Sequence, residues 1–460
     1  MAEAEAKKVY MLFYKVLIMT DLSVRFMGNE LKNPLLLAPA MYNTFVGWFP
    51  KFAHKIAKAG WAGIVAKNIV TEDVRVGFCS EPALWTTRIR TPVGRRMKES
   101  MALVNAGPDV EFYSERKLDD PAEEIWRIDK ERMKKGIEKA HQEGLVVIGN
   151  MSPTGPENAA RVAKLYEECG YDGLEFNTSC PMIHELGMGA FAIGVYAEKI
   201  QEIIKAIKEV TSLPLMVKLS PHTFSVPDTA RAAVKAGADA ISAINTFLSI
   251  IGIDVETGYP ISRSADGGFS SPCGYSGPPI KPIGLRVVWE IARSVKIPIS
   301  GIGGAHDWES VVEYMMVGAT TVQLATAPMF RGLGVAREIL DGMTEFMKRK
   351  GYESVYDFIG LSVSRIVPVG VATFTAAKPA VAVVDTEKCT GCRRCEIVCD
   401  DNNSSAIKVV DGKAIVDDAL CLGCGLCSCV CPVECISYKP ITMQKKIEIM
   451  KNFHRQAEVE

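Results

Sequence analysis

The chain has 460 residues, with 53 lysines and arginines against 54 aspartates and glutamates, so its formal net charge at pH 7 is −1. No overall electrostatic field draws such a protein to nucleic acid or to an anionic membrane. The 14 cysteines need a compartment that keeps thiols reduced, which predicts a cytoplasmic protein and argues against a disulfide framework. The length is enough for one large domain and one small one.

Residues 1–20 are predicted to form an N-terminal extension. Its apolar run Val9–Met19 is interrupted by Lys15 and is too short to span a bilayer. No small-residue cleavage site follows the run. We expect it to be partly buried, with a weak signal anchor as the alternative, and we expect no membrane span.

Residues 21–350 alternate short β-branched runs with helical stretches, which is the pattern of a parallel α/β fold. Several predicted helices end in a glycine just before the next strand, as at Gly170, Gly237 and Gly318. Eight such units in this length predict a closed (β/α)8 TIM barrel rather than an open doubly wound sheet. The candidate strands are Leu35–Ala40, Ala62–Lys67, Leu145–Asn150, Asp172–Asn177, Pro214–Leu219, Asp239–Asn245, Ile297–Gly301 and Thr320–Ala325.

Two segments, 71–130 and 247–279, are longer than ordinary barrel loops. They follow the second and sixth candidate strands, at the face where such barrels carry their chemistry, so we expect lids or substrate covers. The first segment contains Arg88, Arg90 and further arginines. These arginines either bind an anionic substrate or lie on a solvated surface.

Polar residues gather at the ends of five candidate strands. Inward polar groups at this rim cost free energy unless a polar ligand satisfies them. The isoalloxazine ring of a flavin offers matching groups, and a lysine near its N1 stabilises the charge of the reduced form. The sequence therefore predicts a flavin site that includes Lys67, Asn150, Asn177, Lys218, Asn245 and Thr246.

Small-residue turns follow the last two strands, where barrels of this type bind phosphate through backbone N–H groups. Gly303 and Gly304 follow the seventh strand, Ala325 and Thr326 follow the eighth, and Gly277 is placed to add a further donor. The chain has no G-x-G-x-x-G fingerprint after a first strand, so no NAD domain is predicted. The turns fit FMN rather than FAD, whose adenine half would need more room.

Two cysteine runs near the C-terminus each have the C-x2-C-x2-C-x3-C spacing of two-cluster ferredoxins. In such domains each run gives three ligands to one [4Fe-4S] cluster and its fourth ligand to the other. The alternative is a pair of zinc knuckles, which would have no use for eight interleaved cysteines. The predicted ligands are Cys389, Cys392, Cys395 and Cys431 for the first cluster, and Cys421, Cys424, Cys427 and Cys399 for the second.

These runs define a predicted ferredoxin-like α+β domain at residues 380–440. A linker at 351–379 precedes it, and a charged tail at 441–460 follows it without an assigned function. Cys429 and Cys435 fall outside the ligand pattern, and we expect both to be small buried residues.

The motif Asn177-Thr178-Ser179-Cys180-Pro181, taken with Lys67, Lys218, the pair Asn245–Thr246 and the run 301–304, resembles the dihydroorotate and dihydropyrimidine dehydrogenase flavoproteins. The resemblance covers residues 21–438, and the appended two-cluster domain is similar to the dihydropyrimidine dehydrogenase branch. It implies that Cys180 is the general acid/base. It also implies that Asn177, Ser179, Asn245 and Thr246 hold the substrate, while Lys67, Asn150 and Lys218 contact FMN.

The resemblance departs at Met182, where the family usually has Asn or His, so the sequence leaves the substrate open. We expect an oxidoreductase that reduces or forms a C=C bond next to a carbonyl, first of all a dihydropyrimidine dehydrogenase-like enzyme. The alternatives are dihydroorotate or another unsaturated ring compound as substrate. A rival of another class is an electron-transfer subunit, which would need no proton donor such as Cys180.

Because flavins exchange electrons singly or in pairs and clusters exchange single electrons, the two-cluster domain is expected to connect a two-electron reaction to an outside carrier. The chain has no predicted nucleotide domain of its own. The expected partner is therefore a ferredoxin or a separate FAD/NAD(P)H-oxidising subunit, and the protein is expected to be oligomeric.

Overall fold

The computed structural model describes two compact units, Met1–Arg365 and Ile366–Glu460. The run Val9–Met19 lies outside the described residues, and no helix within them is long and apolar enough to cross a membrane. The described ranges are 20–39, 52–67, 69–71, 87–90, 101–105, 111–113, 127–128, 130–153, 155–178, 194, 196–250, 252–259, 273–368, 378–402 and 404–457.

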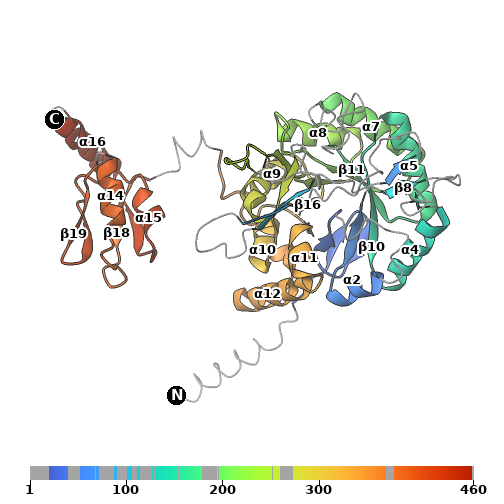
Figure 1. Cartoon of the computed structure of the whole chain (residues 1–460), viewed down its shortest axis with the longest axis horizontal. Helices are drawn as coiled ribbons and strands as arrows, with labels where there is room; N and C mark the ends of the chain where they lie inside the picture. The colour runs from blue at the N-terminus through green and yellow to red at the C-terminus, as the bar shows by residue number, and fades with distance from the viewer. Residues whose placement is uncertain are drawn as a thin grey trace, which may run out of the picture. The chain divides into compact units, whose positions relative to one another are not determined.

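The first unit contains a closed barrel of eight parallel strands, which confirms the predicted (β/α)8 fold (Figure 1). The strands are short, and every residue with a described burial in seven of them is buried, as expected when helices cover a parallel sheet. Around the barrel they are β10 (Val146–Met151), β11 (Gly173–Asn177), β12 (Leu215–Lys218), β13 (Ala240–Ala243), β16 (Ile299–Ile302), β17 (Thr321–Leu324), β3 (Leu35–Leu37) and β4 (Gly63–Ala66).

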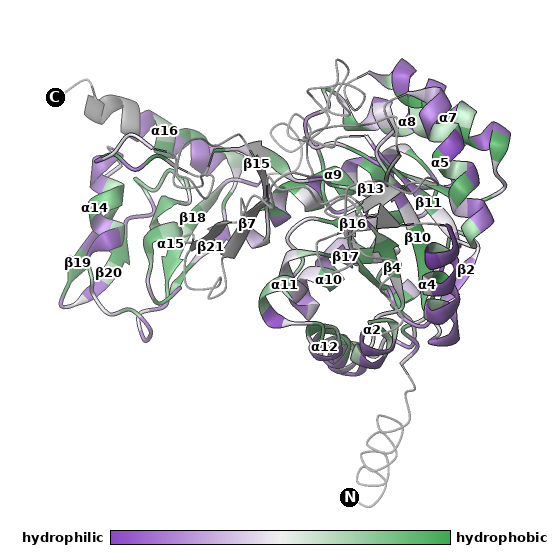
Figure 2. Cartoon of the chain, turned by 45° about the vertical axis from the view of Figure 1, so that its right-hand side comes forward, coloured by the Kyte–Doolittle hydropathy of each residue, from purple (hydrophilic) through white to green (hydrophobic). Residues whose placement is uncertain are grey.

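One principal helix follows each barrel strand along the chain. In α7, Ile200, Ile203, Ile204 and Ile207 recur at helical spacing and are all buried, so the helix packs on the barrel through one stripe. The helices carry hydrophilic residues beside these apolar ones (Figure 2). They are α2 (Ala53–Ala59), α4 (Lys130–Gln142), α5 (Pro156–Cys169), α7 (Ala197–Val210), α8 (Val226–Ala236), α9 (Lys281–Ser294), α10 (Trp308–Met316) and α12 (Val335–Lys350), with the short α11 (Thr326–Arg331) before α12.

The two long segments after β4 and β13 form sheets, which the sequence did not predict. A four-stranded sheet has the order β14-β15-β7-β6, so it joins strands from both segments. Gly274 pairs with Asn105 in an antiparallel register across this junction. The strands are β6 (Thr87–Arg90), β7 (Met101–Asn105), β14 (Phe247–Ser249) and β15 (Cys273–Ser276), and a second sheet contains β5 (Ile69–Thr71), β8 (Glu111–Tyr113) and β9 (Arg127–Ile128).

The residues directly after α12 belong to the barrel unit. Val355 and Phe358 are fully buried in its core. Trp289 Nε1 donates a hydrogen bond to the Val363 carbonyl oxygen at 3.0 Å, and Asp21 N donates to Glu353 O at 2.7 Å. The first part of the predicted linker 351–379 therefore packs on the barrel, as the unit boundary at Arg365 also indicates.

The described residues of the second unit form two small antiparallel sheets and three helices. Its charged tail is helical, and Ile449 in this helix is fully buried in the core of the unit. A hairpin of β1 (Val24–Phe26) and β2 (Asn29–Leu31) belongs instead to the first unit. The elements of the second unit are β18 (Ala380–Val384), α14 (Arg394–Asp401), β19 (Ile407–Val410), β20 (Lys413–Val416), α15 (Leu426–Val430), β21 (Ile436–Pro440) and α16 (Met443–Ala457).

The packing of residues 352–363 predicts where the barrel can be cut. A chain that ends after Arg365 should remain soluble and folded. A chain that ends after Lys350 should lose cooperative unfolding, because removal of one buried Phe side chain such as Phe358 already costs about 3 to 5 kcal/mol. Circular dichroism melts of both truncations check this, and equal thermal midpoints would show that the segment is a linker after all.

Candidate functional site

A polar layer lies inside the barrel, in the C-terminal halves of its strands. Its acceptor is the fully buried carboxylate of Glu175 in β11. Asn150 Nδ2 donates to Glu175 Oε1 at 2.5 Å, Ser242 Oγ donates to Oε2 at 2.8 Å, and Gln323 Nε2 donates to Oε2 at 3.0 Å. Lys218 Nζ lies 3.8 Å from Oε1. Strands β10, β11, β12, β13 and β17 are thus tied to one carboxylate.

The Glu175–Lys218 pair is almost completely shielded from solvent, with side-chain exposures of 0% and 6%. Burial of a charge is costly unless an opposite charge and hydrogen bonds compensate it. The three hydrogen-bond donors and the ammonium group supply that compensation. The layer therefore holds the Lys218 ammonium in a fixed place at the end of β12, beneath the predicted flavin face.

Two buried amide oxygens of this layer have no hydrogen-bond partner within the described part of the chain. They are Asn150 Oδ1 and Gln323 Oε1, and the nearby Ser152 Oγ is also without one. Because Asn150 commits its Nδ2 to Glu175, its Oδ1 is left as an acceptor. A buried acceptor without a donor costs about 1 to 3 kcal/mol, so these atoms fit a polar ligand that donates hydrogen bonds.

Asn177, Asn245 and Thr246 lie together at the end of the barrel. Asn245 Nδ2 donates to Asn177 Oδ1 at 3.0 Å, and Thr246 N donates to Asn245 Oδ1 at 2.9 Å. Thr178 fixes the strand end by a 2.8 Å hydrogen bond from its hydroxyl to the Lys218 carbonyl oxygen. Three of the four predicted substrate residues are thus adjacent, and their role stays a prediction.

Of the three remaining predicted residues at this end of the barrel, the structure describes only Lys67. Lys67 follows β4 directly and is half-buried. Ser179 and the predicted acid/base Cys180 lie outside the described residues.

The predicted phosphate turns after β15, β16 and β17 converge. Gly304 has φ +76°, and a Cβ on it would lie 2.6 Å from the Gly277 carbonyl oxygen and 2.9 Å from Lys281 N. Ser276 Oγ lies 3.2 Å from Thr326 Oγ1, which joins the end of β15 to the start of α11. These contacts form a narrow backbone cradle of the kind that accepts a phosphate. Gly303 precedes Gly304 in this cradle, and Ala325 immediately precedes α11.

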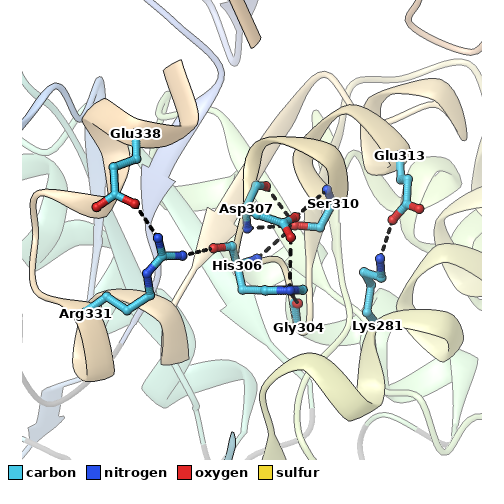
Figure 3. A network of polar contacts seen from close by, with 8 residues as sticks. All are labelled: Lys281, Gly304, His306, Asp307, Ser310, Glu313, Arg331 and Glu338. Atoms are coloured by element: carbon cyan, nitrogen blue, oxygen red, sulfur yellow. Dashed lines mark hydrogen bonds and ion pairs between the residues drawn. The ribbon is translucent and has the colours of Figure 1, made fainter. Parts of the chain in front are cut away.

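A group of polar contacts holds the Gly304 turn against the following helices (Figure 3). His306 Nδ1 lies 3.0 Å from the Gly304 carbonyl oxygen, and His306 Nε2 lies 3.1 Å from Asp307 Oδ2. Arg331 at the end of α11 donates to the His306 carbonyl oxygen at 2.7 Å. Burial lowers the pKa of His306, but Asp307 and Gly304 outweigh it, so the pKa is raised. These contacts weaken as pH rises through that pKa.

In the second unit, one cavity is lined by the four predicted ligands of the first cluster, Cys389, Cys392, Cys395 and Cys431. Cys431 of the second run thus lies in one cavity with three cysteines of the first run, and that these four bind one cluster stays a prediction. The Ala414 N–H donates to Cys389 Sγ at 3.4 Å, which is the main reason why the pKa of this thiol is lowered. A lowered pKa favours the thiolate that iron needs.

The second predicted ligand set is Cys421, Cys424, Cys427 and Cys399. Cys421 and Cys427 are buried, Cys424 is exposed and Cys399 is half-buried. The Ala382 N–H donates to Cys421 Sγ at 3.3 Å, the counterpart of the Ala414–Cys389 contact. Of the two cysteines predicted to be small buried residues, Cys435 is buried but Cys429 is exposed, so for Cys429 the prediction is wrong.

Comparison with known families agrees with this geometry. A family model described as dihydroorotate dehydrogenase matches residues 21–347, and one described as 4Fe-4S dicluster domain matches residues 382–438. The chain belongs to the dihydroorotate dehydrogenase family. The catalytic subunit of dihydroorotate dehydrogenase B (NAD(+)) from Pyrococcus abyssi is 35% identical over 343 residues, which are 74% of this chain and 99% of that protein. The subunit PreA of NAD-dependent dihydropyrimidine dehydrogenase from Escherichia coli is 29% identical over 393 residues, 84% of this chain and 87% of that protein.

This member of the dihydroorotate dehydrogenase family is an oxidoreductase that acts on CH–CH bonds, with FMN and two [4Fe-4S] clusters as cofactors. The described residues fit both groups. The free amide oxygen of Asn150, the Lys218 ammonium and the Gly304 cradle suit the ring and phosphate of FMN, and the cysteine-lined cavity suits a cluster. FMN supplies hydride transfer when it is bound. Which residues contact it stays a prediction.

Sequence reasoning missed Glu175, Gln323 and His306. A usable signal existed for Glu175, because it lies two positions before Asn177 in a strand and therefore on the same face. A charged residue inside an otherwise apolar strand indicates a buried partner. Gln323 in β17 is a weaker indication of a buried partner, because its side chain is polar but uncharged.

Glu175→Gln should destabilise the barrel by about 3 to 5 kcal/mol, because it leaves the Lys218 ammonium buried without a counter-charge. It should also reduce the FMN content of the purified protein. Removal of both charges in Glu175→Gln/Lys218→Gln should restore part of the stability. Thermal midpoints and the flavin-to-protein ratio measure both effects.

The control for this substitution is Glu345→Gln, which removes an exposed carboxylate 3.4 Å from Lys348 and should change little. Wild-type midpoint and flavin content in Glu175→Gln would show that the polar layer does not depend on the charge.

Gly304→Ala should weaken FMN binding by at least about tenfold, or about 1.4 kcal/mol, because the added Cβ would enter the cradle. Gly144→Ala separates this effect from backbone strain, since Gly144 has a similar φ of +71° but no atom within 4 Å of a Cβ. Flavin fluorescence titration of the apoprotein gives both affinities. Equal affinities in the two variants would place the phosphate elsewhere.

Proposed function

We propose that this protein catalyses the interconversion of a pyrimidine and its 5,6-dihydro form, with a neutral dihydropyrimidine as the first candidate substrate. The observation that favours it is the length of the match to the dihydropyrimidine dehydrogenase subunit of Escherichia coli. Its 393 residues exceed the 365 residues of the barrel unit, so the likeness extends into the two-cluster unit.

The alternative substrate is dihydroorotate. The higher sequence identity to the Pyrococcus abyssi subunit favours dihydroorotate. That match covers 343 residues, which is fewer than the 365 residues of the barrel unit. Orotate carries a carboxylate, which would need a cation. The charge of Lys218 is already compensated by Glu175, so the arginines of the first long segment, such as Arg88 and Arg90, would have to supply it.

The roles of the chain's own residues follow from the predicted site. The adjacent amides of Asn177 and Asn245 suit the amide-like edge of a pyrimidine ring, because each amide can donate and accept. The Lys218 amino group, held beside Glu175, is placed to donate a hydrogen bond to the flavin ring. Cys180 gives a proton to the ring carbon next to the one that receives hydride, or takes it in the reverse direction.

The two-cluster unit is proposed to carry electrons to or from a separate partner. A ferredoxin or an FAD/NAD(P)H-oxidising subunit fits, because the chain shows no dinucleotide-binding fingerprint. We place the reaction in the cytoplasm, where thiols stay reduced. A barrel that served only as an electron relay for a partner's active site would not need Cys180.

Anaerobic reoxidation of the reduced protein tests the substrate. Uracil or thymine should reoxidise the flavin at least about ten times faster than orotate does, in stopped-flow absorbance. Cys180→Ala should slow this step by about 10^2 to 10^4, the usual worth of a positioned acid/base, with unchanged flavin and iron content. Cys180→Ser should keep partial activity with its optimum at higher pH, since a hydroxyl is a weaker acid than a thiol.

Faster reoxidation by orotate would favour the dihydroorotate alternative. Wild-type rates in Cys180→Ala, or no reoxidation by any pyrimidine, would favour the relay.

A further inference from the structure

The cavity of the first cluster contains a fifth thiol. Cys435 lines it together with the four predicted ligands and is only 5% exposed. Its Sγ lies 3.4 Å from Cys431 Sγ, and its backbone N–H donates to the same sulfur at 3.4 Å. A [4Fe-4S] cluster needs four cysteines, so this site holds one thiol more than it uses.

The second unit is built from two equivalent halves, which makes an internal comparison possible. Gly391 and Gly423 occupy the same place in the two cysteine runs and have φ of +67° and +66°. A Cβ on Gly391 would lie 2.3 Å from the Gly412 carbonyl oxygen, and one on Gly423 would lie 2.1 Å from the Ala380 carbonyl oxygen. Each run is thus packed in the same way against a strand or turn of the unit.

The position equivalent to Cys435 is occupied by Ala406. Each residue lies directly before a strand, β21 for Cys435 and β19 for Ala406. The Cys435 carbonyl oxygen accepts a 2.8 Å hydrogen bond from Asp385 N, and the Ala406 carbonyl oxygen accepts a 2.7 Å hydrogen bond from Asp417 N. Both side chains are buried. The second cluster therefore has an inert methyl group where the first has a thiol.

We propose that Cys435 is a reserve ligand of the first cluster, able to bind the iron atom that Cys431 holds. The two sulfurs lie 3.4 Å apart in one cavity and belong to a five-residue turn, so a small side-chain movement exchanges them. In this exchange the bond between iron and the Cys431 sulfur breaks, and a bond between iron and the Cys435 sulfur forms. The Cys435 thiol gives its proton to water, Cys431 takes one up, and no electron moves.

The consequence is an asymmetry between the two clusters. The first cluster keeps four thiolate ligands when Cys431 is lost or oxidised. The second cluster has the methyl group of Ala406, not a thiol, at the position equivalent to Cys435.

The test is the pair of matched variants Cys431→Ala and Cys399→Ala in the full-length protein, purified without oxygen. Cys431→Ala should retain about eight iron and eight labile sulfide atoms, the content of two four-iron clusters. Cys399→Ala should lose one or more iron atoms and show the signal of a three-iron cluster by EPR. Cys431→Ala/Cys435→Ala should resemble Cys399→Ala.

Equal iron loss in Cys431→Ala and in Cys399→Ala would overturn the proposal, and so would full iron content in Cys431→Ala/Cys435→Ala. The transplant Cys399→Ala/Ala406→Cys keeps the test decisive if Cys431→Ala does not fold. It should recover the iron that Cys399→Ala loses, and failure to recover it in a folded protein counts against the reserve role. Iron content and EPR are independent of the substrate, so they do not depend on the proposed reaction.

Discussion

The ion pair of Glu175 and Lys218, with 3.8 Å between its charged atoms and almost no exposure to solvent, constrains the strands that meet inside the barrel. A carboxylate buried in this way needs several donors, which come from strands β10, β13 and β17, while β12 supplies the opposite charge. Because the Glu175 carboxylate accepts a hydrogen bond from Asn150 Nδ2, it fixes the orientation of the Asn150 amide. The polar layer therefore holds a buried cation and an amide oxygen without a partner among the described residues, and both groups suit the predicted flavin ring.

The barrel strands and the two-cluster domain were predictable because their signals are local. Short β-branched runs between helices mark the strands, and the spacing of cysteines such as Cys389, Cys392 and Cys395 marks a cluster. The pairing of β7 with β15 was not predictable in this way, because it joins segments about 170 residues apart through backbone hydrogen bonds. The packing of Val355 and Phe358 was missed because a short apolar segment after a helix resembles a linker. Glu175 was missed although it shares a strand face with Asn177.

Close backbone contacts occur at a predicted cofactor site in each unit, beside the side chains already described. Gly304 in the barrel and Gly391 and Gly423 in the second unit stand where a Cβ would overlap a carbonyl oxygen. Such close approach packs the cysteine runs against a strand or turn in the second unit, and in the barrel it forms the turn that is predicted to bind phosphate. One chain thus combines a rim suited to hydride transfer with a unit suited to single-electron transfer, as a reaction coupled to an external carrier requires.

A crystal structure of the FMN-loaded protein would test most directly whether the Glu175 carboxylate organises the flavin site. The account predicts the polar edge of the ring against Asn150 and Lys218, with Lys218 still beside Glu175, and the phosphate against the backbone of Gly277, Gly304 and Thr326. A ring bound away from Asn150, or a Lys218 side chain turned away from Glu175 to form the flavin contact, would contradict the claim that one buried carboxylate organises the site.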